Sequence, residues 1–146
     1  THRDFAQSCL FVTGHLKDGS FDLDWPMLAR ARQTVVIYMS LTGLATICAQ
    51  LIAHGLPADW PAAVVAQGSL ASQRVVCATL ATLAAEVERG GLRSPCLTIV
   101  GEVVRLRDEF RRRFEDAGFV GYRLDVGHAG LLGGLMRALG RRAGGT

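Results

Sequence analysis

The chain has 146 residues, of which 49% are hydrophobic and 20% are charged, a composition that fits one folded domain and argues against a disordered or collagen-like chain. Its net charge is +3, no apolar run reaches the ~18 to 20 residues that a membrane-spanning helix requires, and the first residues do not resemble a signal peptide. We therefore expect a cytoplasmic protein. Because residue 1 is Thr rather than Met, we also treat the chain as part of a longer one.

Strand-like and helix-like segments alternate along most of the chain. Apolar, β-branched runs bounded by Gly, Ser and Asp predict the strands, and apolar residues at helical spacing predict the helices. In chain order we expect strands over residues 10–13, 34–39, 62–66, 73–79 and 96–100, and helices over residues 26–32, 42–54, 80–89 and through the arginine-rich stretch 105–113. This alternation predicts an α/β fold with a mixed, mostly parallel sheet flanked by helices.

Two of these helices have recognisable ends. Asp24 stands before Trp25-Pro26, so its side chain can cap the helix that begins there, with proline in the first turn. Gly55 follows the helix over 42–54, as is typical of a helix C-terminus.

The last thirty residues differ from the rest because they are rich in glycine. A weak amphipathic helix over 128–142 would run through five apolar side chains, Leu131, Leu132, Leu135, Met136 and Leu139. Each glycine inside such a helix costs ~1 kcal/mol relative to alanine. We therefore divide the chain into a folded domain, 1–116, and a Gly-rich tail, 117–146.

Neither the arginines nor the cysteines indicate a site of their own. Acidic residues stand among the arginines of 105–113, which is more typical of a solvated helix face than of a nucleic-acid surface, and aromatic residues do not alternate with the basic ones as a single-strand binding platform would need. Cys9, Cys48, Cys77 and Cys96 form no CxxC pair and stand in apolar stretches, so we expect free thiols in a reducing compartment and no metal site.

The ends of the predicted strands are the first candidates for a binding site. Three of the apolar runs stop at small residues, at Met39-Ser40, at Gly68-Ser69 and at Gly101. Ligands of open α/β sheets gather at the carboxyl ends of strands. His15, after Gly14, suits either an exposed loop or an anion contact. Arg3 lies in a polar cluster that is either a helix start or a carboxylate site.

Five blocks of the sequence, in order and at matching spacing, carry a resemblance to a known family. They are Thr-His-Arg-Asp-Phe-Ala-Gln-Ser at 1–8, Phe-Val-Thr-Gly-His at 11–15, Gln-Thr-Val-Val-Ile-Tyr-Met at 33–39, Gln-Gly-Ser with Gln-Arg-Val-Val at 67–76, and Pro-Cys-Leu-Thr-Ile-Val-Gly-Glu-Val-Val at 95–104. Together they resemble the uroporphyrinogen-III C-methyltransferases, a group of S-adenosylmethionine-dependent tetrapyrrole methylases. The likeness covers about residues 1–108 and implies the C-terminal domain of a two-domain fold.

The resemblance also implies binding residues. For the methyl donor, S-adenosyl-L-methionine, it indicates Met39 and Gly68, and more weakly Pro95 to Thr98. A methionine thioether suits sulfonium and adenosine surroundings, and a glycine lets its backbone approach a ligand closely. For the tetrapyrrole, whose carboxylates favour cationic groups, it indicates Arg3 and His15. The family's catalytic residues and donor loop belong to the first domain, so none is expected here.

Two functions follow as alternatives. The first is methylation of uroporphyrinogen III at C2 and C7, through precorrin-1 to precorrin-2, by a longer homodimeric enzyme that supplies the missing N-terminal domain; this chain alone would then be inactive. The second is a non-catalytic module that binds donor or tetrapyrrole, or only mediates dimerisation. Under neither do we expect a nucleic acid or a membrane as partner.

Overall fold

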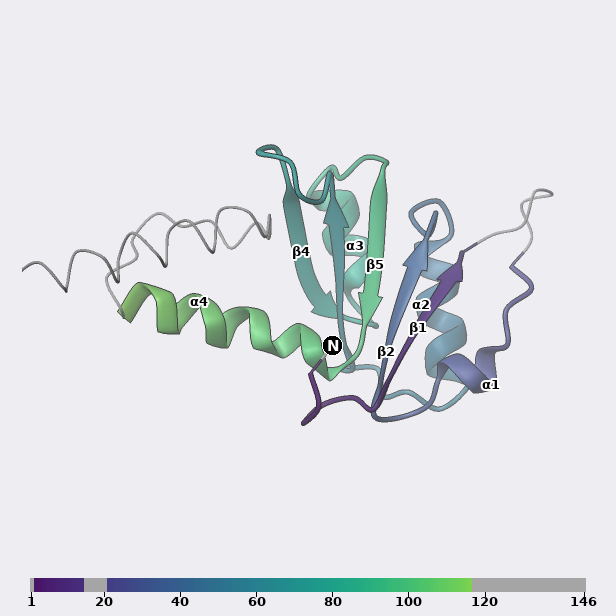
Figure 1. Cartoon of the computed structure of the whole chain (residues 1–146). Helices are drawn as coiled ribbons and strands as arrows, with labels where there is room; N and C mark the ends of the chain where they lie inside the picture. Colours follow the sequence, from purple (N-terminus) through teal and green to yellow (C-terminus); the bar gives the residue numbers. More distant parts are fainter. Residues whose placement is uncertain (1, 15–20, 117–146) are drawn as a thin grey trace, which may run out of the picture.

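The computed structural model of the chain describes residues 2–14 and 21–116, which form a five-stranded sheet flanked by helices (Figure 1). In chain order its elements are strand β1 Ser8–Thr13, helix α1 Trp25–Leu28, strand β2 Gln33–Tyr38, helix α2 Leu44–Ala53, strand β3 Pro61–Ala66, strand β4 Arg74–Thr79, helix α3 Leu83–Arg89, strand β5 Cys96–Val100, the 3-10 turn η1 Glu102–Arg105 and helix α4 Leu106–Asp116. Each predicted strand is present within two residues of its expected bounds. The tail, 117–146, lies outside the described residues.

The order of the strands is β1-β2-β5-β3-β4. β1 and β2 pair in parallel, whereas the pairs β2–β5, β5–β3 and β3–β4 are antiparallel. The α/β fold and the mixed sheet are therefore as expected. The expectation of a mostly parallel sheet is wrong, since one of the four pairings is parallel.

The reason lies in which strands become neighbours. β2, α2 and β3 do form a parallel crossover, and so do β4, α3 and β5, but in each case another strand lies between the two. β5 enters the sheet between β2 and β3 and runs against both. β3 and β4 are joined by the short loop 67–73 without a helix, so they pair as a hairpin. An apolar run indicates that a strand is buried, but it does not indicate which strands pair with it. The order of the strands could therefore not be predicted from these runs.

The strands begin and finish at two opposite ends of the sheet, which we call its upper and lower edges. At the upper edge, which lies at the top in Figure 1, β1, β2 and β3 end and β4 and β5 begin. At the lower edge all five directions are reversed. Met39 and Gly68 therefore follow strands at the upper edge, whereas Gly101, which follows β5, lies at the lower one.

The two faces of the sheet are also unequal. α1, α2 and α3 pack on one face, where the fully buried side chains include Ile37, Leu51, Val64 and Leu83. Burying each such side chain stabilises the fold by about 1.5–3 kcal/mol. On the opposite face, which we call the open face, η1 packs against β3 and β5, and Arg107 and Phe110 of α4 line a hollow together with residues of the sheet. No described helix is long and apolar enough to cross a membrane.

Candidate functional site

Three of the predicted ligand-binding residues lie at the upper edge, although each is 27 or more positions from the next along the chain. Met39 follows β2, Gly68 follows β3 and Pro95 precedes β5. The loops are joined by backbone hydrogen bonds: the Gln67 N–H donates to the Pro95 carbonyl at 3.1 Å, and the Gly14 N–H donates to the Tyr38 carbonyl at 2.6 Å. The ends of β1, β2, β3 and β5 thus form one continuous platform.

The backbone at this edge is conformationally unusual. Met39, Gln67 and Ser69 have φ values of 50°, 51° and 68°, in the left-handed region that side chains other than glycine rarely adopt. Among the described non-glycine residues only Arg32, at the lower edge, shares this property. Such positions persist where the surrounding structure holds them, and they cluster at functional sites.

The loop after β3 is held by one buried side chain. Gln73 is 5% exposed, and its Oε1 accepts a hydrogen bond from the Ser69 N–H at 2.7 Å. Gly68 itself is exposed and has no positive φ. A Cβ on Gly68 would meet the Val65 side chain at 3.6 Å and Gln73 Oε1 at 3.8 Å, which are ordinary contacts. The fold therefore does not require glycine here.

Thr98 lies beneath the edge rather than on it. Its side chain is 1% exposed, and its Oγ1 forms a 2.6 Å hydrogen bond with Oγ of Ser40, which is fully buried. This hydroxyl pair ties the turn after β2 to the middle of β5. In this structure Thr98 acts on the edge through Ser40, by holding the turn that presents Met39.

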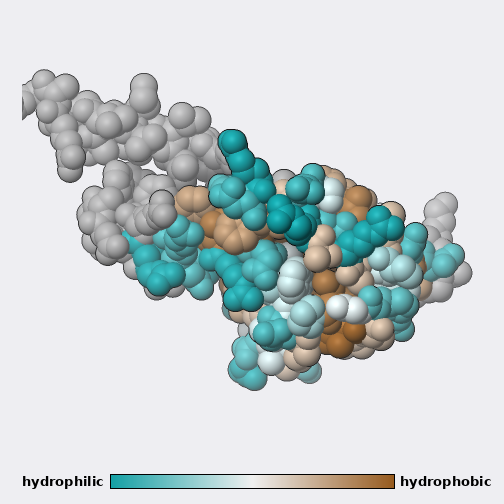
Figure 2. Space-filling view, turned by 90° about the horizontal axis from the view of Figure 1, so that it is seen from below, coloured by the Kyte–Doolittle hydropathy of each residue, from teal (hydrophilic) through white to brown (hydrophobic). Residues whose placement is uncertain are grey.

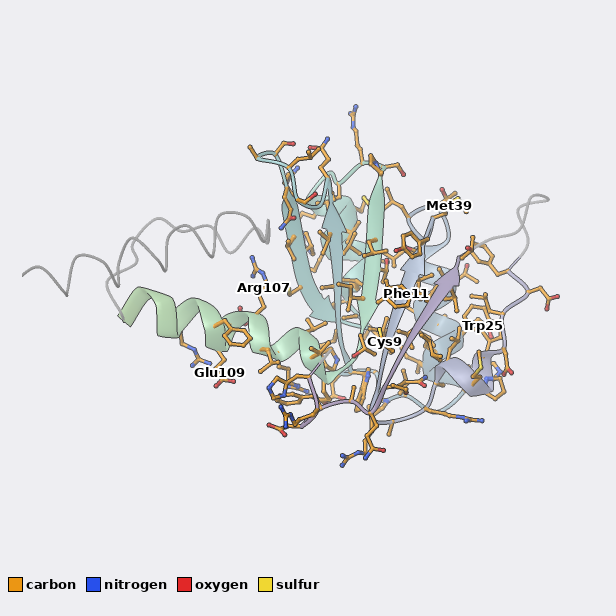
Figure 3. All side chains as sticks on the ribbon, in the orientation of Figure 1. Cys9, Phe11, Trp25, Met39, Arg107 and Glu109 are labelled. Atoms are coloured by element: carbon orange, nitrogen blue, oxygen red, sulfur yellow. The ribbon has the colours of Figure 1, made fainter. Side chains whose placement is uncertain are left out.

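The surface of the upper edge is apolar and weakly basic. Met39 is 56% exposed and reaches out from the end of β2 (Figure 3), and Tyr38 and Leu70 are also exposed. The described segments here, 13–14, 38–43, 66–74 and 92–96, contain Arg74 and Arg93 but no acidic residue. Sequence reasoning missed both arginines; the signal was that Arg74 is the first residue of β4 and Arg93 shortly precedes β5, two strands that begin at this edge.

The two predicted substrate residues are not brought together. Arg3 is exposed in a turn before β1, near the lower edge, and six strand residues, about 20 Å, separate that edge from Gly14. His15 lies outside the described residues. Figure 2 views the molecule from below and shows a mainly hydrophilic surface interrupted by smaller apolar areas. Arg3 therefore remains a prediction separate from the upper-edge platform.

A hollow of about 520 Å³ occupies the open face of the sheet. It touches the upper edge at Gly68, Ser69 and Gln73, whereas Met39 and Pro95 are not among its lining residues. It therefore coincides only in part with the platform on which the predicted donor residues meet.

Comparison with known proteins gives a family match. A family model described as Tetrapyrrole (Corrin/Porphyrin) Methylases matches residues 1–84. The siroheme synthase of Methylobacillus flagellatus is 65% identical over 109 residues, which is 75% of this chain and 23% of that protein. The siroheme synthase of Nitrosospira multiformis is 64% identical over 73% of this chain and 22% of its own length. The chain thus spans less than a quarter of these curated relatives.

Solved structures give the same result. The uroporphyrin-III C-methyltransferase of Thermus thermophilus complexed with S-adenosylhomocysteine has a TM-score of 0.61 at 32% identity, over 73% of this chain and 47% of that one. Its native form has a TM-score of 0.64 at 34% identity, over 73% and 45%. A cobalt precorrin-4 methyltransferase, at 19% identity and a TM-score of 0.63, shares the fold. These matches agree with the resemblance carried by the five sequence blocks.

Proposed function

The chain belongs to the tetrapyrrole (corrin/porphyrin) methylase family, and on this basis we propose that it supplies the second domain of an S-adenosyl-L-methionine-dependent uroporphyrinogen-III C-methyltransferase. The proposed reaction methylates C2 and C7 of uroporphyrinogen III, through precorrin-1, and gives precorrin-2. The names of its relatives, siroheme synthase and uroporphyrin-III C-methyltransferase, support this substrate. The domain boundary at residue 116 and the homodimeric state are parts of the same proposal.

One observation carries the proposal beyond family membership. Met39, Gly68 and Pro95 were chosen from separate sequence blocks, and they converge on the edge where the parallel strands β1, β2 and β3 end. Ligands of α/β sheets bind at that end of the strands. The relative solved with S-adenosylhomocysteine supports a donor-derived ligand in this fold.

The residues of the platform fit such a donor. An exposed thioether at Met39 offers a soft, polarizable contact, and the exposed Gly68 lets its backbone be approached closely. When bound, S-adenosylmethionine supplies an electrophilic methyl group on a sulfonium. Its transfer requires alignment and exclusion of water more than a strong base. This chain's part is therefore to orient the donor, with Ser40 and Thr98 fixing the turn that carries Met39.

The tetrapyrrole requires cationic partners because it carries carboxylates. Arg3 and His15 remain the proposed contacts, and Arg74 and Arg93 place further positive charge near the donor platform. The acid/base residues and the donor loop are proposed to come from a first domain upstream of Thr1. Alone, this chain is expected to show no methyltransferase activity.

A chimera tests the proposal directly. The 109-residue stretch of this chain that matches the Methylobacillus flagellatus siroheme synthase at 65% identity replaces its counterpart in that protein. We expect the chimera to convert uroporphyrinogen III to precorrin-2, measured by absorbance, and the isolated 146-residue chain to fail. A folded chimera that binds S-adenosylhomocysteine without turnover would favour the binding-module alternative. A folded chimera that does neither would overturn the assignment of the platform.

A further inference from the structure

The loop over residues 67–73, which joins β3 to β4 and carries Gly68, contains no buried apolar side chain. Residues 67–72 are all exposed, and Leu70, the largest apolar residue among them, is 58% exposed. Two backbone bonds within the loop are local: the Leu70 N–H donates to the Gln67 carbonyl at 3.2 Å, and the Gln73 N–H donates to the Leu70 carbonyl at 3.0 Å. The shape of the loop therefore depends on hydrogen bonds rather than on burial.

The residues on both sides of Gly68 have a disfavoured backbone conformation. Gln67 and Ser69 have φ values of 51° and 68°, in the left-handed region where a Cβ is crowded. Such a conformation persists only where neighbouring groups hold it. Gln67 is held by the Pro95 carbonyl, which accepts its N–H at 3.1 Å. Ser69 is held by Oε1 of Gln73, which accepts its N–H at 2.7 Å.

The Gln73 side chain lies close to Gly68 as well as to Ser69. It is 5% exposed, and a Cβ on Gly68 would be 3.8 Å from its Oε1. All three residues line the hollow where it reaches the upper edge. A change in the Gln73 side chain is therefore transmitted to the Gly68 backbone through a single hydrogen bond.

A second buried glutamine, at the lower edge, has a different task. Gln33 is 7% exposed, and its Nε2 donates to the carbonyls of Met27 and Leu28 at 2.8 Å each. These bonds tie the start of β2 to α1, whose Leu28 belongs to the core. Gln73 is equally buried, yet its Oε1 holds an exposed residue. Because burying a polar side chain costs free energy unless it is hydrogen-bonded, the place of Gln73 indicates that the shape of the loop matters, and not only the stability of the core.

We propose that Gln73 is a positioning residue for the methyl donor. Its Oε1 fixes Ser69 in the left-handed conformation and thereby sets the direction of the Gly68 backbone that the donor approaches. Gln73 acts through Ser69 and Gly68 and does not have to touch the donor itself. The inference rests on the proposed function, because that function makes Gly68 a donor contact.

The test uses the chimera with the siroheme synthase of Methylobacillus flagellatus and three variants of it. Gln73→Leu removes the acceptor at similar side-chain size. Gln73→Glu keeps an acceptor oxygen whether its carboxyl group is charged or neutral. Gln33→Leu is the matched control, because it removes the buried glutamine of the lower edge. Calorimetric titration measures the affinity for S-adenosylhomocysteine, thermal unfolding measures Tm, and precorrin-2 formation gives KM for S-adenosylmethionine and kcat.

We expect Gln73→Leu to bind S-adenosylhomocysteine about tenfold more weakly and to raise KM about tenfold, with kcat changed less than about threefold, since the contact is made equally in the ground state and the transition state. Gln73→Glu should restore the affinity to within about threefold of the unmodified chimera. Gln33→Leu should lower Tm and leave affinity and KM unchanged. If Gln73→Leu does not fold, Gln73→Asn replaces it, because its side chain is one methylene shorter and moves the acceptor away from Ser69.

The unmodified chimera separates the two ways in which this inference could fail. If it binds S-adenosylhomocysteine and the Gln73 variants bind equally well, the positioning role is overturned and the proposed function stands. The same holds if Gln33→Leu loses as much affinity as Gln73→Leu, because the loss would then follow stability alone. If the unmodified chimera folds but binds no S-adenosylhomocysteine, the proposed function is overturned and the positioning role with it.

Discussion

Gly68 at the upper edge and Gly101 at the lower edge both follow strands of the same sheet, yet the fold requires glycine at only one of these two positions. At the lower edge Gly101 has a φ of 141°, and a Cβ there would lie 2.8 Å from the Gln33 carbonyl oxygen. At the upper edge Gly68 has ordinary dihedrals and room for a side chain, while the non-glycine residues Met39, Gln67 and Ser69 take positive φ values. The fold explains the glycine at position 101, whereas it does not by itself explain Gly68 or the positive φ values of Met39, Gln67 and Ser69.

Gly101→Ala should show the largest effect, because the lower edge leaves no room for it. The Cβ collides with backbone, and the positive φ adds strain of about 1–3 kcal/mol. We expect the free energy of unfolding to fall by about 3 kcal/mol in urea titrations. A loss below about 1 kcal/mol would show that the two edges do not differ as described.

Gly68→Val is the matched change at the upper edge. The protein without ligand should lose less than about 1 kcal/mol of stability, since residue 68 is exposed and a Cβ there meets only ordinary contacts. Affinity for S-adenosylhomocysteine in the chimera should fall about tenfold for Gly68→Ala and about a hundredfold, or 2.7 kcal/mol, for Gly68→Val. Calorimetric titration measures this. Unaltered affinity in both variants would remove Gly68 from the site.

Ser40→Ala tests whether the platform depends on the buried hydroxyl pair. It leaves Thr98 Oγ1 buried without the partner that it has at 2.6 Å, which costs about 2 kcal/mol of stability. Ser40→Ala combined with Thr98→Val removes both hydroxyls and should recover part of that loss. If the double variant is as unstable as the sum of the single ones, the pair does not act as a unit.

Of these variants, Met39→Ala should cause the smallest change in free energy, and it should weaken ligand binding rather than the stability of the fold. Met39 is 56% exposed, so truncation should change the free energy of unfolding by less than about 1 kcal/mol. Affinity for S-adenosylhomocysteine in the chimera should fall about tenfold, or 1.4 kcal/mol. Unchanged affinity together with a large drop in melting temperature would place Met39 in the core instead.

The sequence predicted more of the fold than of the site. Strand positions followed from apolar runs such as 34–39, because local pattern determines which segments are extended. The place of β5 depends on long-range pairing, so the sequence pattern grouped Gly101 with Met39 although they lie at opposite edges. Met39 and Gly68 were found through family resemblance, and composition alone would have favoured a core side chain and a turn glycine.

Thr98 shows why the rest could not be predicted. Its position in a block shared with the family suggested a ligand contact, but side-chain direction alternates along a strand. Its burial and its bond to Ser40 became visible only once β5 was placed beside β2. Arg74 and Arg93 were missed for the related reason that nothing in sequence places the starts of β4 and β5 at the same edge of the sheet as the end of β2.

The central position of β5 has a consequence for how the chain is synthesised. The ribosome makes residues 1–95 before residues 96–100, and residues 1–95 contain β1–β2 and β3–β4, two strand pairs that do not neighbour each other. Each pair exposes an unpaired strand, β2 or β3, until residues 96–100 emerge and join them. Unpaired strand edges invite association with other chains. A nascent chain halted before Cys96 would therefore expose both β2 and β3 without their common partner. The five-stranded sheet is complete only after residues 96–100 have been made.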